Sequence, residues 1–387
     1  MSHSAQVLVE LGGVLLLLSL LNRLALWMKQ SPIPFYMTAG LFLGSGGLIP
    51  LSASNEFFKL GSELGVVILL LSIGLEYSPK ELVRSIGKSK SIALIDAALN
   101  AIPGFIAGYL LTQNITAALI IAGVTWVSSS GVIVKVLRDL GRMTNRETPS
   151  IITVLVLEDF AMAFYLPVLS AIAVGATLLN GSITVAIAIA IVATILTASY
   201  FWGKYISKVF DAENIESVIV GVAGLAILVA GLLTDVQVSS AVGAFLVGIA
   251  LAGKVAAKAA EHLHPLRDFF GAIFFVYFGI QTNPAEIPPA FFPAAALAAV
   301  TIATKVLTGY IAAKKAGIGI PGRWRTGFAL TPRGEFSIII AGLAITAKLD
   351  PTIVSFAATY MLMTVVAGPV LARVPDTTWF KKRLKSS

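Results

Sequence analysis

Apolar runs long enough to cross a bilayer recur from one end of this chain to the other. Hydrophobic residues make up 57% of the 387 residues, and charged residues make up only 12%. A soluble globular chain carries about 25% charged residues, so lipid rather than water surrounds most of this one. The stretches between the apolar runs are too short for a sizeable soluble domain, which excludes a cytoplasmic enzyme domain.

The first apolar run, Leu11 to Leu21, has the length of a signal peptide. It lacks a basic segment before it and a small-residue cleavage pattern after it, so we expect a retained helix. The chain contains no cysteine, which excludes disulfides and thiolate metal sites. Its three histidines, His3, His262 and His264, lie outside the apolar runs. We expect neither a cofactor nor a buried histidine metal site.

Charged, Pro, Gly and Asn clusters divide the chain into about thirteen predicted transmembrane helices of roughly 20 residues each. The fold class predicted is therefore an all-α polytopic membrane protein. The predicted spans are 5–28, 33–50, 60–76, 91–112, 115–138, 150–175, 181–203, 215–233, 238–254, 267–282, 290–313, 324–347 and 352–373.

Positive charge alternates between successive predicted loops. One set of loops and the C-terminal tail hold most of the Lys and Arg, whereas the opposite set holds only Lys59 and Lys348. The positive-inside rule makes the basic set cytoplasmic, and an odd helix count then places the N-terminus outside. We predict a bacterial cytoplasmic (inner) membrane location in this orientation. The net charge of +8 then reflects topology, and no nucleic acid is expected to bind.

Three short segments recur roughly 200 residues later in the chain. The pairs are Gly74–Glu81 with Gly279–Glu286, Gly40–Leu43 with Gly243–Leu246, and Ser128–Gly131 with Thr331–Gly334. Seven predicted helices separate the two copies, and an odd number gives them opposite orientations in the membrane. The sequence therefore predicts two inverted six-helix repeats, an arrangement found in many secondary transporters.

The third pair of segments interrupts the predicted spans 115–138 and 324–347 at corresponding places. Pro332 lacks a backbone donor, and Gly131 and Gly334 weaken a helix. Irregular backbone at membrane depth persists only where it is buried in protein or lines a cavity. We predict that these two breaks form a substrate site, the alternative being two kinks that only adjust packing.

Three ionisable residues lie inside otherwise uncharged runs: Glu158, Asp159 and Lys305. Each costs at least about 2.5 kcal/mol to insert near the bilayer centre, and such residues often mark an ion or proton path. Adjacent helical residues point about 100° apart, so we expect one acid to pair with Lys305 and the other to face a cavity. A carboxylate in that position binds either a cation or a proton, which is the requirement for antiport.

Oxygen ligands for a dehydrated cation are available near the predicted breaks. The candidate cation ligands and helix-break residues are Thr125, Ser128, Ser129, Ser130, Thr153, Thr331, Arg333 and Glu335. Arg333 and Glu335 are expected to pair across the second break. Asp96, near the start of its span, is expected at the membrane interface.

Several segments together resemble the monovalent cation:proton antiporter-2 family, which contains Kef-type and Kht-type potassium antiporters and Nap-type sodium antiporters. The similar segments are Leu64–Glu76, Ser129–Leu137, Leu157–Phe160, Gly243–Gly248, Pro265–Gly279 and Gly334–Ser337. The resemblance implies that Asp159 is the essential cation and proton carboxylate and that Lys305 pairs with the acid before it. Glu158 departs from the family, because Nap-type members carry Asp there and Kef-type members Gln.

The resemblance also implies a homodimer in which a mobile core moves against a static scaffold. It assigns the scaffold to 1–90 and 213–285, the core to 91–175 and 286–374, a linker helix to 176–212 and a basic cytoplasmic tail to 375–387. Kef-type chains continue into a regulatory domain, so here a separate cytoplasmic regulatory subunit, or none, is expected.

The function predicted is exchange of K+, or alternatively Na+, for H+ by elevator-like alternating access. Potassium is favoured because the segments around Ser129 and Leu157 look most Kht-like. Two alternatives remain: an organic-anion symporter of similar inverted-repeat architecture, and a membrane sensor or channel subunit in which the charges lock a static bundle.

Overall fold

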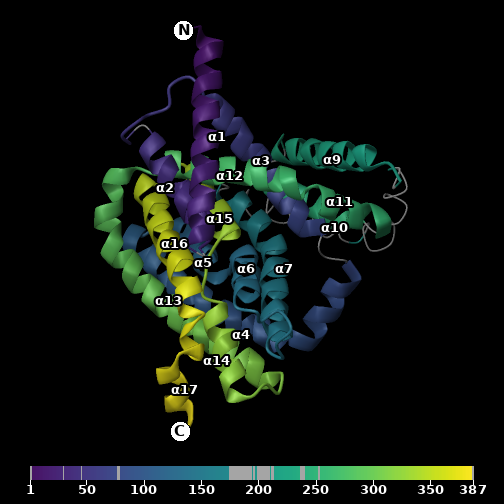
Figure 1. Cartoon of the computed structure of the whole chain (residues 1–387), viewed down its shortest axis with the longest axis vertical. Helices are drawn as coiled ribbons and strands as arrows, with labels where there is room; N and C mark the ends of the chain where they lie inside the picture. Colours follow the sequence, from purple (N-terminus) through teal and green to yellow (C-terminus); the bar gives the residue numbers. More distant parts are fainter. Residues whose placement is uncertain are drawn as a thin grey trace.

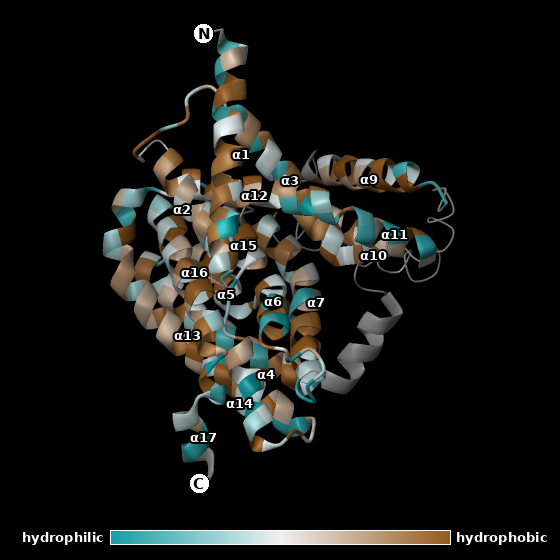
Figure 2. Cartoon of the chain, in the orientation of Figure 1, coloured by the Kyte–Doolittle hydropathy of each residue, from teal (hydrophilic) through white to brown (hydrophobic). Residues whose placement is uncertain are grey.

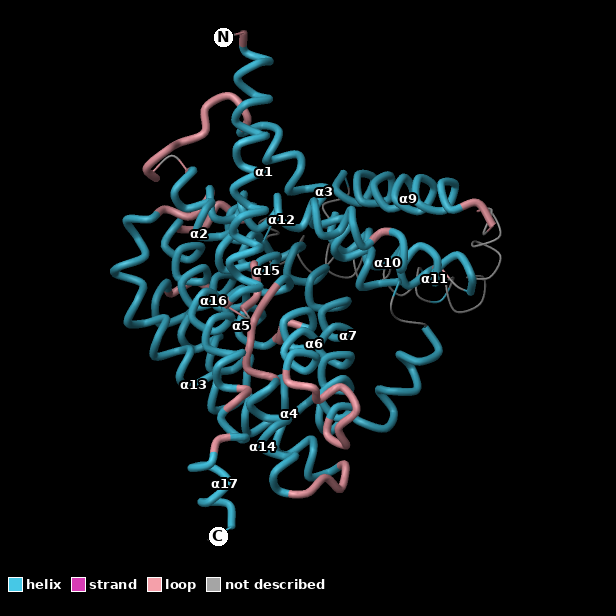
Figure 3. The backbone as a smooth tube through the Cα atoms, viewed as in Figure 1, coloured by secondary structure: helices cyan, strands magenta, loops and turns pink. Residues whose placement is uncertain are grey.

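The computed structural model consists of α-helices joined by short loops. It describes residues 2–28, 30–44, 46–75, 79–173, 194, 197, 210, 213–235, 240–251 and 253–385, and no strand occurs among these (Figure 3). The helices are α1 (His3–Trp27), α2 (Ile33–Leu43), α3 (Asn55–Leu75), α4 (Pro79–Thr112), α5 (Ile115–Trp126), α6 (Ser130–Asp139), α7 (Thr148–Ala173), α9 (Ile215–Asp235), α10 (Ser240–Ala250), α11 (Gly253–His262), α12 (His264–Ile280), α13 (Ile287–Lys315), α14 (Ile320–Ala329), α15 (Glu335–Thr346), α16 (Pro351–Leu371) and α17 (Thr378–Lys385). The all-α prediction is confirmed.

Many of these helices are apolar over a length that suits a membrane. Eight described helices are long and apolar enough to cross one, or nine if the bent pair Gly253–His262 and His264–Ile280 forms a single span. Figure 2 shows hydrophobic residues along α1, α9 and α16, whereas α17 is hydrophilic. The chain is a multi-pass membrane protein. The count of thirteen spans is not confirmed, and the predicted span 181–203 lies almost entirely outside the described residues.

Both spans predicted to be broken are indeed two helices each. Residues 127–129 separate α5 from α6, and residues 330–334 separate α14 from α15. The second break contains Pro332, which has no N–H to continue the helix. At the first break the Ser129 hydroxyl accepts a hydrogen bond from the N–H of Val132, so this side chain caps α6.

Two close contacts between glycines reproduce the repeat seen in the sequence. A Cβ added to Gly40 of α2 would lie 2.8 Å from the Cα of Gly279 in α12. One added to Gly248 of α10 would lie 2.8 Å from the Cα of Gly74 in α3. Gly74 and Gly279 are the repeat-related glycines, so the two contacts, α2 with α12 and α10 with α3, are related by the same repeat.

The helices pack mainly within two groups. In the first, α3 lies against α10 and α12, with α1, α2, α9 and α11 around them; in the second, α4 and α5 pack with α7, α13, α14, α15 and α16. Figure 1 shows α9, α10 and α11 on one side of the molecule and α13 and α16 on the other. Helices α11 and α17 lie where loops were expected. Helix α4 begins at Pro79 rather than near residue 91.

Candidate functional site

The two helix breaks meet inside the second group of helices. The N–H of Ser129 donates to the carbonyl of Pro332 at 2.9 Å, and the Ser128 hydroxyl donates to the Leu330 carbonyl at 3.0 Å. Nearby, the hydroxyl of Ser337 on α15 donates to the carbonyl of Val124 on α5 at 2.9 Å. The broken helices therefore cross at their breaks, as the family resemblance implies for the spans 115–138 and 324–347, and bring four helix ends together.

The ammonium group of Lys305 on α13 lies beside this crossing and is fully buried. Its nitrogen is 2.7 Å from Asp96 Oδ1, 2.7 Å from Glu158 Oε1 and 2.8 Å from the Trp126 carbonyl. An ammonium has three N–H donors, and each has an acceptor here, from α4, α7 and the last turn of α5. The cation also sits at the negative end of the α5 dipole, which stabilises it.

Glu158 on α7 is held from both sides. Besides Lys305, its carboxylate accepts the N–H of Ser128 at 2.6 Å, and it shares the Ser128 hydroxyl proton, at 3.2 Å, with the Leu330 carbonyl. The side chain is 1% exposed. The ion pair expected between Lys305 and the first acid of the pair is present, and the first break supplies the other donors.

Asp96 was expected at the membrane interface, and this prediction is wrong. Its side chain is buried on α4, where Oδ1 pairs with Lys305 and Oδ2 accepts the indole N–H of Trp126 at 2.9 Å. The Asn100 amide also donates to Oδ1 at 3.0 Å. Because α4 starts twelve residues earlier than the predicted span, Asp96 lies farther from the helix end than the sequence indicated.

Asp159 points to a different element from its neighbour. Its Oδ2 accepts the hydroxyl of Ser130, the first residue of α6, at 3.3 Å, and the side chain is 1% exposed. The N-terminal end of a helix carries positive partial charge, which stabilises a carboxylate beside it. Glu158 and Asp159 are thus divided between Lys305 and α6, in keeping with the angle between consecutive helical residues.

Arg333 lies in the second break and is fully buried. Its Nη1 donates to the carbonyls of Leu330 and Thr331, at 3.4 and 3.1 Å, and so compensates the negative end of α14. Among the described residues, Nε and Nη2 of Arg333 have no hydrogen-bond partner. The side chain of Glu335 lies outside the described residues, so the predicted Arg333–Glu335 pair stays a prediction.

Three of the candidate ligand hydroxyls are occupied by helix carbonyls. Thr125 donates to the Asn100 carbonyl at 2.8 Å, which joins α5 to α4. Thr153 donates to Pro149 of its own helix at 2.8 Å, and Thr331 donates to the Phe328 carbonyl at 3.0 Å. The structure brings Ser128 and Ser130 to the two acids and Ser129 to the opposite break, and it places these threonines in helix packing.

Two cavities flank the boundary between the two helix groups. One, of about 360 Å³, is lined by Gly131 and Lys135 of α6 and by the C-terminal half of α3. The other, of about 300 Å³, is lined by α15 and by the N-terminal half of α3, including Lys59 and Glu63. They therefore lie toward opposite ends of α3.

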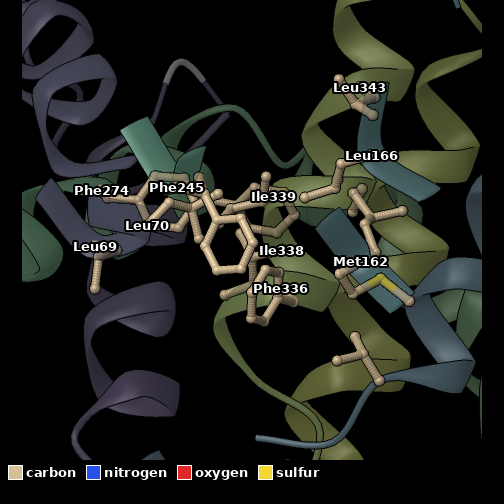
Figure 4. Close-up of a cluster of buried hydrophobic side chains, with 14 of the residues drawn as sticks. Leu69, Leu70, Met162, Leu166, Phe245, Phe274, Phe336, Ile338, Ile339 and Leu343 are labelled. Carbon is tan, nitrogen blue, oxygen red and sulfur yellow. The ribbon is translucent and has the colours of Figure 1, made fainter. Parts of the chain in front are cut away.

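An apolar cluster occupies the boundary between these cavities. Figure 4 shows Leu70, Phe245 and Phe274 from the first group facing α15 and α7 of the second. The labelled residues from the second group are Met162, Leu166, Phe336, Ile338, Ile339 and Leu343. These side chains are apolar and buried, so a charged ion would be costly to place among them.

A family model described as sodium/hydrogen exchanger, transmembrane, matches residues 13–374. The K(+)/H(+) antiporter subunit KhtU of Bacillus subtilis (strain 168) is 33% identical over 378 residues, which cover 94% of this chain and 92% of that protein. The ammonium/H(+) antiporter subunit AmhT of Alkalihalophilus pseudofirmus is 28% identical over 391 residues, covering 98% and 97% of the two chains.

Solved structures agree with these matches at the level of the fold. The sodium proton antiporter MjNhaP1 from Methanocaldococcus jannaschii, solved at pH 8, superposes with a TM-score of 0.72 and covers 95% of this chain and 96% of its own. Its sequence identity is 19%, so this likeness shows a shared fold alone.

Proposed function

We propose that this chain, which belongs to the sodium/hydrogen exchanger family and is a cation/proton antiporter, exchanges a monovalent cation for protons at Asp159 and Glu158. The observation that carries the proposal is the placement of two adjacent buried carboxylates at the crossing of the helix breaks. Glu158 pairs with Lys305. We do not propose an organic-anion symporter or a static sensor, because the matching proteins are cation/proton antiporters.

Asp159 is the group for which cation and proton compete. With Asp159 ionised, a cation at its carboxylate is stabilised by that charge and by neutral oxygens of the breaks. With Asp159 protonated, the same position offers no charge to the cation, and the proton is carried in its place. Ser130, whose hydroxyl is 3.3 Å from the carboxylate, is the neighbouring candidate ligand.

We propose potassium as the transported cation, with sodium as the alternative. The support is the resemblance of the segments around Ser129 and Leu157 to Kht-type antiporters, together with the identity of 33% to a K(+)/H(+) antiporter subunit. The similarity to an ammonium/H(+) antiporter subunit makes ammonium, a cation of nearly the same radius as potassium, the third ion to test.

Alternating access is proposed to follow from a vertical movement of one helix group against the other. The core would comprise 91–175 and 286–374, the scaffold 1–90 and 213–285, and the linker 176–212. Each cavity reaches the group boundary from one end of α3, and the apolar cluster between them separates the two. Carrying the site past this cluster would expose it to each side in turn.

The remaining proposals concern placement and assembly. We place the chain in the bacterial cytoplasmic (inner) membrane with its N-terminus outside and the basic tail 375–387 inside, because positive loops stay in the cytoplasm. A homodimer is proposed from the resemblance to the antiporter-2 family. A separate cytoplasmic regulatory subunit is proposed because the potassium relative is itself a subunit of an antiporter.

Proton flux in proteoliposomes tests the proposed function. With a pH dye inside, imposed gradients of K+, Na+ or NH4+ should each be compared in wild type and Asp159→Asn. We expect a K+ gradient to drive proton movement in the wild type and not in the variant. Because NH3 crosses lipid unaided, the ammonium arm needs protein-free liposomes as its baseline. If no cation moves protons in folded, reconstituted wild type across a range of pH, the proposal is wrong.

A further inference from the structure

Lys305 forms ion pairs with two buried carboxylates, although one carboxylate would be enough to neutralise its charge. Asp96 on α4 and Glu158 on α7 each lie 2.7 Å from its ammonium nitrogen. Their side chains are 3% and 1% exposed. The three groups together carry one net negative charge when all are ionised, and this charge lies next to Asp159. Asp96 has no part in the exchange proposed above.

The orientation of Asp96 is fixed by groups other than Lys305. The Trp126 indole donates to Oδ2 at 2.9 Å, and the Asn100 amide donates to Oδ1 at 3.0 Å. Asn100 is itself held by α13, since its Oδ1 accepts the Thr304 hydroxyl at 3.0 Å and its amide donates to Thr308 at 3.2 Å. Asp96 therefore presents one oxygen to Lys305 from a rigid frame.

Glu158 also has donors that do not depend on Lys305. The N–H and hydroxyl of Ser128 reach its carboxylate at 2.6 and 3.2 Å. If Glu158 turns toward a bound cation or takes up a proton, Lys305 loses one acceptor but keeps Asp96. A buried lysine without a carboxylate would be costly, so this second partner matters.

We propose that Asp96 is a positioning residue of the exchange site: by sharing Lys305 with Glu158, it keeps the lysine paired throughout the cycle and leaves a net negative charge for the cation. This inference rests on the proposed function and adds a residue to it. Asp96 acts by pairing with Lys305 and by its negative charge, and it is not a ligand of the transported ion.

The charged groups around Asp96 are few. In the described part of the chain α4 packs chiefly against α5, α7 and α13. Helix α7 contributes Glu158, and α13 contributes Lys305. Helix α5 contributes the indole N–H of Trp126, which is a neutral donor. Removing the Asp96 charge therefore leaves Lys305 balanced by Glu158 alone, with one negative charge fewer beside Asp159.

The test is exchange by Asp96→Asn in proteoliposomes over a range of cation concentration and pH, beside wild type and Asp159→Asn. A charge this close changes ion or proton binding about tenfold. We expect the cation concentration for half-maximal exchange to rise about tenfold, and the pH for half-maximal exchange to fall by about one unit. The maximal rate should stay within about threefold of wild type.

Two control variants separate charge from structure. Trp126→Phe removes the indole donor and keeps the Asp96 charge. The cation concentration and the pH for half-maximal exchange should therefore stay as in the wild type, even if the protein is less stable. Asp96→Glu restores the charge and should return both values toward wild type. If Asp96→Asn shows the same cation and pH dependence of exchange as the wild type, Asp96 has only a structural role and the inference is wrong. The proposed function is judged separately, because it is supported if Asp159→Asn is inactive while the wild type is active.

A further variant covers the case in which Asp96→Asn does not fold. Asp96→Asn combined with Lys305→Gln removes both partners of that pair, and it is compared with Lys305→Gln alone. The measurement is the K+-induced rise in melting temperature in detergent, from which the half-saturating K+ concentration is obtained. The double variant has one negative charge fewer beside Asp159 than Lys305→Gln alone, so its half-saturating K+ concentration should be about tenfold higher. Equal concentrations for the two proteins would contradict the inference.

Discussion

The N–H of Ser129 donates to the carbonyl of Pro332 at 2.9 Å, so the first helix break is bonded to the second through the backbone. The bond joins residues that are about 200 positions apart and that the internal repeat relates to each other. It brings the positive end of α6 and the negative end of α14 to one place in the membrane. Three charged side chains lie around this bond. The carboxylates of Glu158 and Asp159 are near the positive end of α6, and the guanidinium of Arg333 is at the negative end of α14.

Lys305→Met should destabilise the protein strongly. The change leaves Asp96 and Glu158 buried beside each other without their shared cation, and losing one partner of a buried ion pair costs about 3–5 kcal/mol. Thermal unfolding in detergent measures the effect. Lys314→Met, at the exposed end of the same helix, is the matched control and should change the melting temperature little. Equal shifts for the two variants would contradict the described cluster.

Gly40→Ala should destabilise the contact between α2 and α12, because the new methyl group would lie 2.8 Å from the Cα of Gly279. Overpacking of this kind costs about 1–3 kcal/mol. Gly13→Ala is the matched control, since nothing lies within 4 Å of a Cβ there and alanine favours the helix by up to about 1 kcal/mol. Melting temperatures should therefore move in opposite directions, and a drop of similar size in both would argue against close α2–α12 packing.

Phe274→Ala should make the protein leak protons. Phe274 belongs to the apolar cluster between the two cavities, and truncating it opens space where water can enter (Figure 4). The measurement is dissipation of a pH gradient in proteoliposomes without any transported cation. Phe292→Ala, at a side chain that is 79% exposed, should leave the membrane tight. A tight Phe274→Ala protein that still exchanges ions would show that this cluster is not the barrier.

Asp376→Asn should loosen the end of the chain from the helices of the site. The Asp376 carboxylate is bonded to Arg142, in the loop between α6 and α7, and to Arg325 of α14 at 2.8 Å. The Arg142 side chain is 4% exposed, so losing this charged partner should cost about 1–3 kcal/mol. Lys381→Gln, which removes an exposed partner 3.7 Å from the same carboxylate, should cost less than about 1 kcal/mol. Chemical or thermal unfolding of both variants checks that Asp376→Asn loses more stability than Lys381→Gln.

The broken helices and the acid–lysine pair could be predicted from the sequence because their signals are local. Pro332 and the glycines at the two breaks weaken a helix wherever they stand, and the repeat links the two places. Glu158, Asp159 and Lys305 are conspicuous in uncharged runs, where insertion is costly. The pairing of Lys305 with Glu158 then follows from the small number of charges available.

Other parts of the site depend on packing that the sequence does not display. Asp96 was assigned to the interface because it lies near the start of its predicted span, whereas packing of α4 against α5 and α13 brings it to Trp126 and Lys305. Thr125 and Thr153 carry the right oxygen for a cation, but a threonine in an apolar helix commonly bonds to a carbonyl instead. The short helices α11 and α17 are rich in charge and lack the apolar pattern of a span.

The most direct test of the account is the number of protons released when a cation binds. Purified wild type and Asp159→Asn are titrated with K+ in weakly buffered detergent solution near neutral pH, with proton release and heat of binding followed together. If cation and proton compete for one carboxylate, the wild type should release up to about one proton for each cation bound, with the amount depending on pH, and Asp159→Asn should release almost none. Cation binding without proton release at any pH, or equal release from both proteins, would contradict the claim that they compete at Asp159.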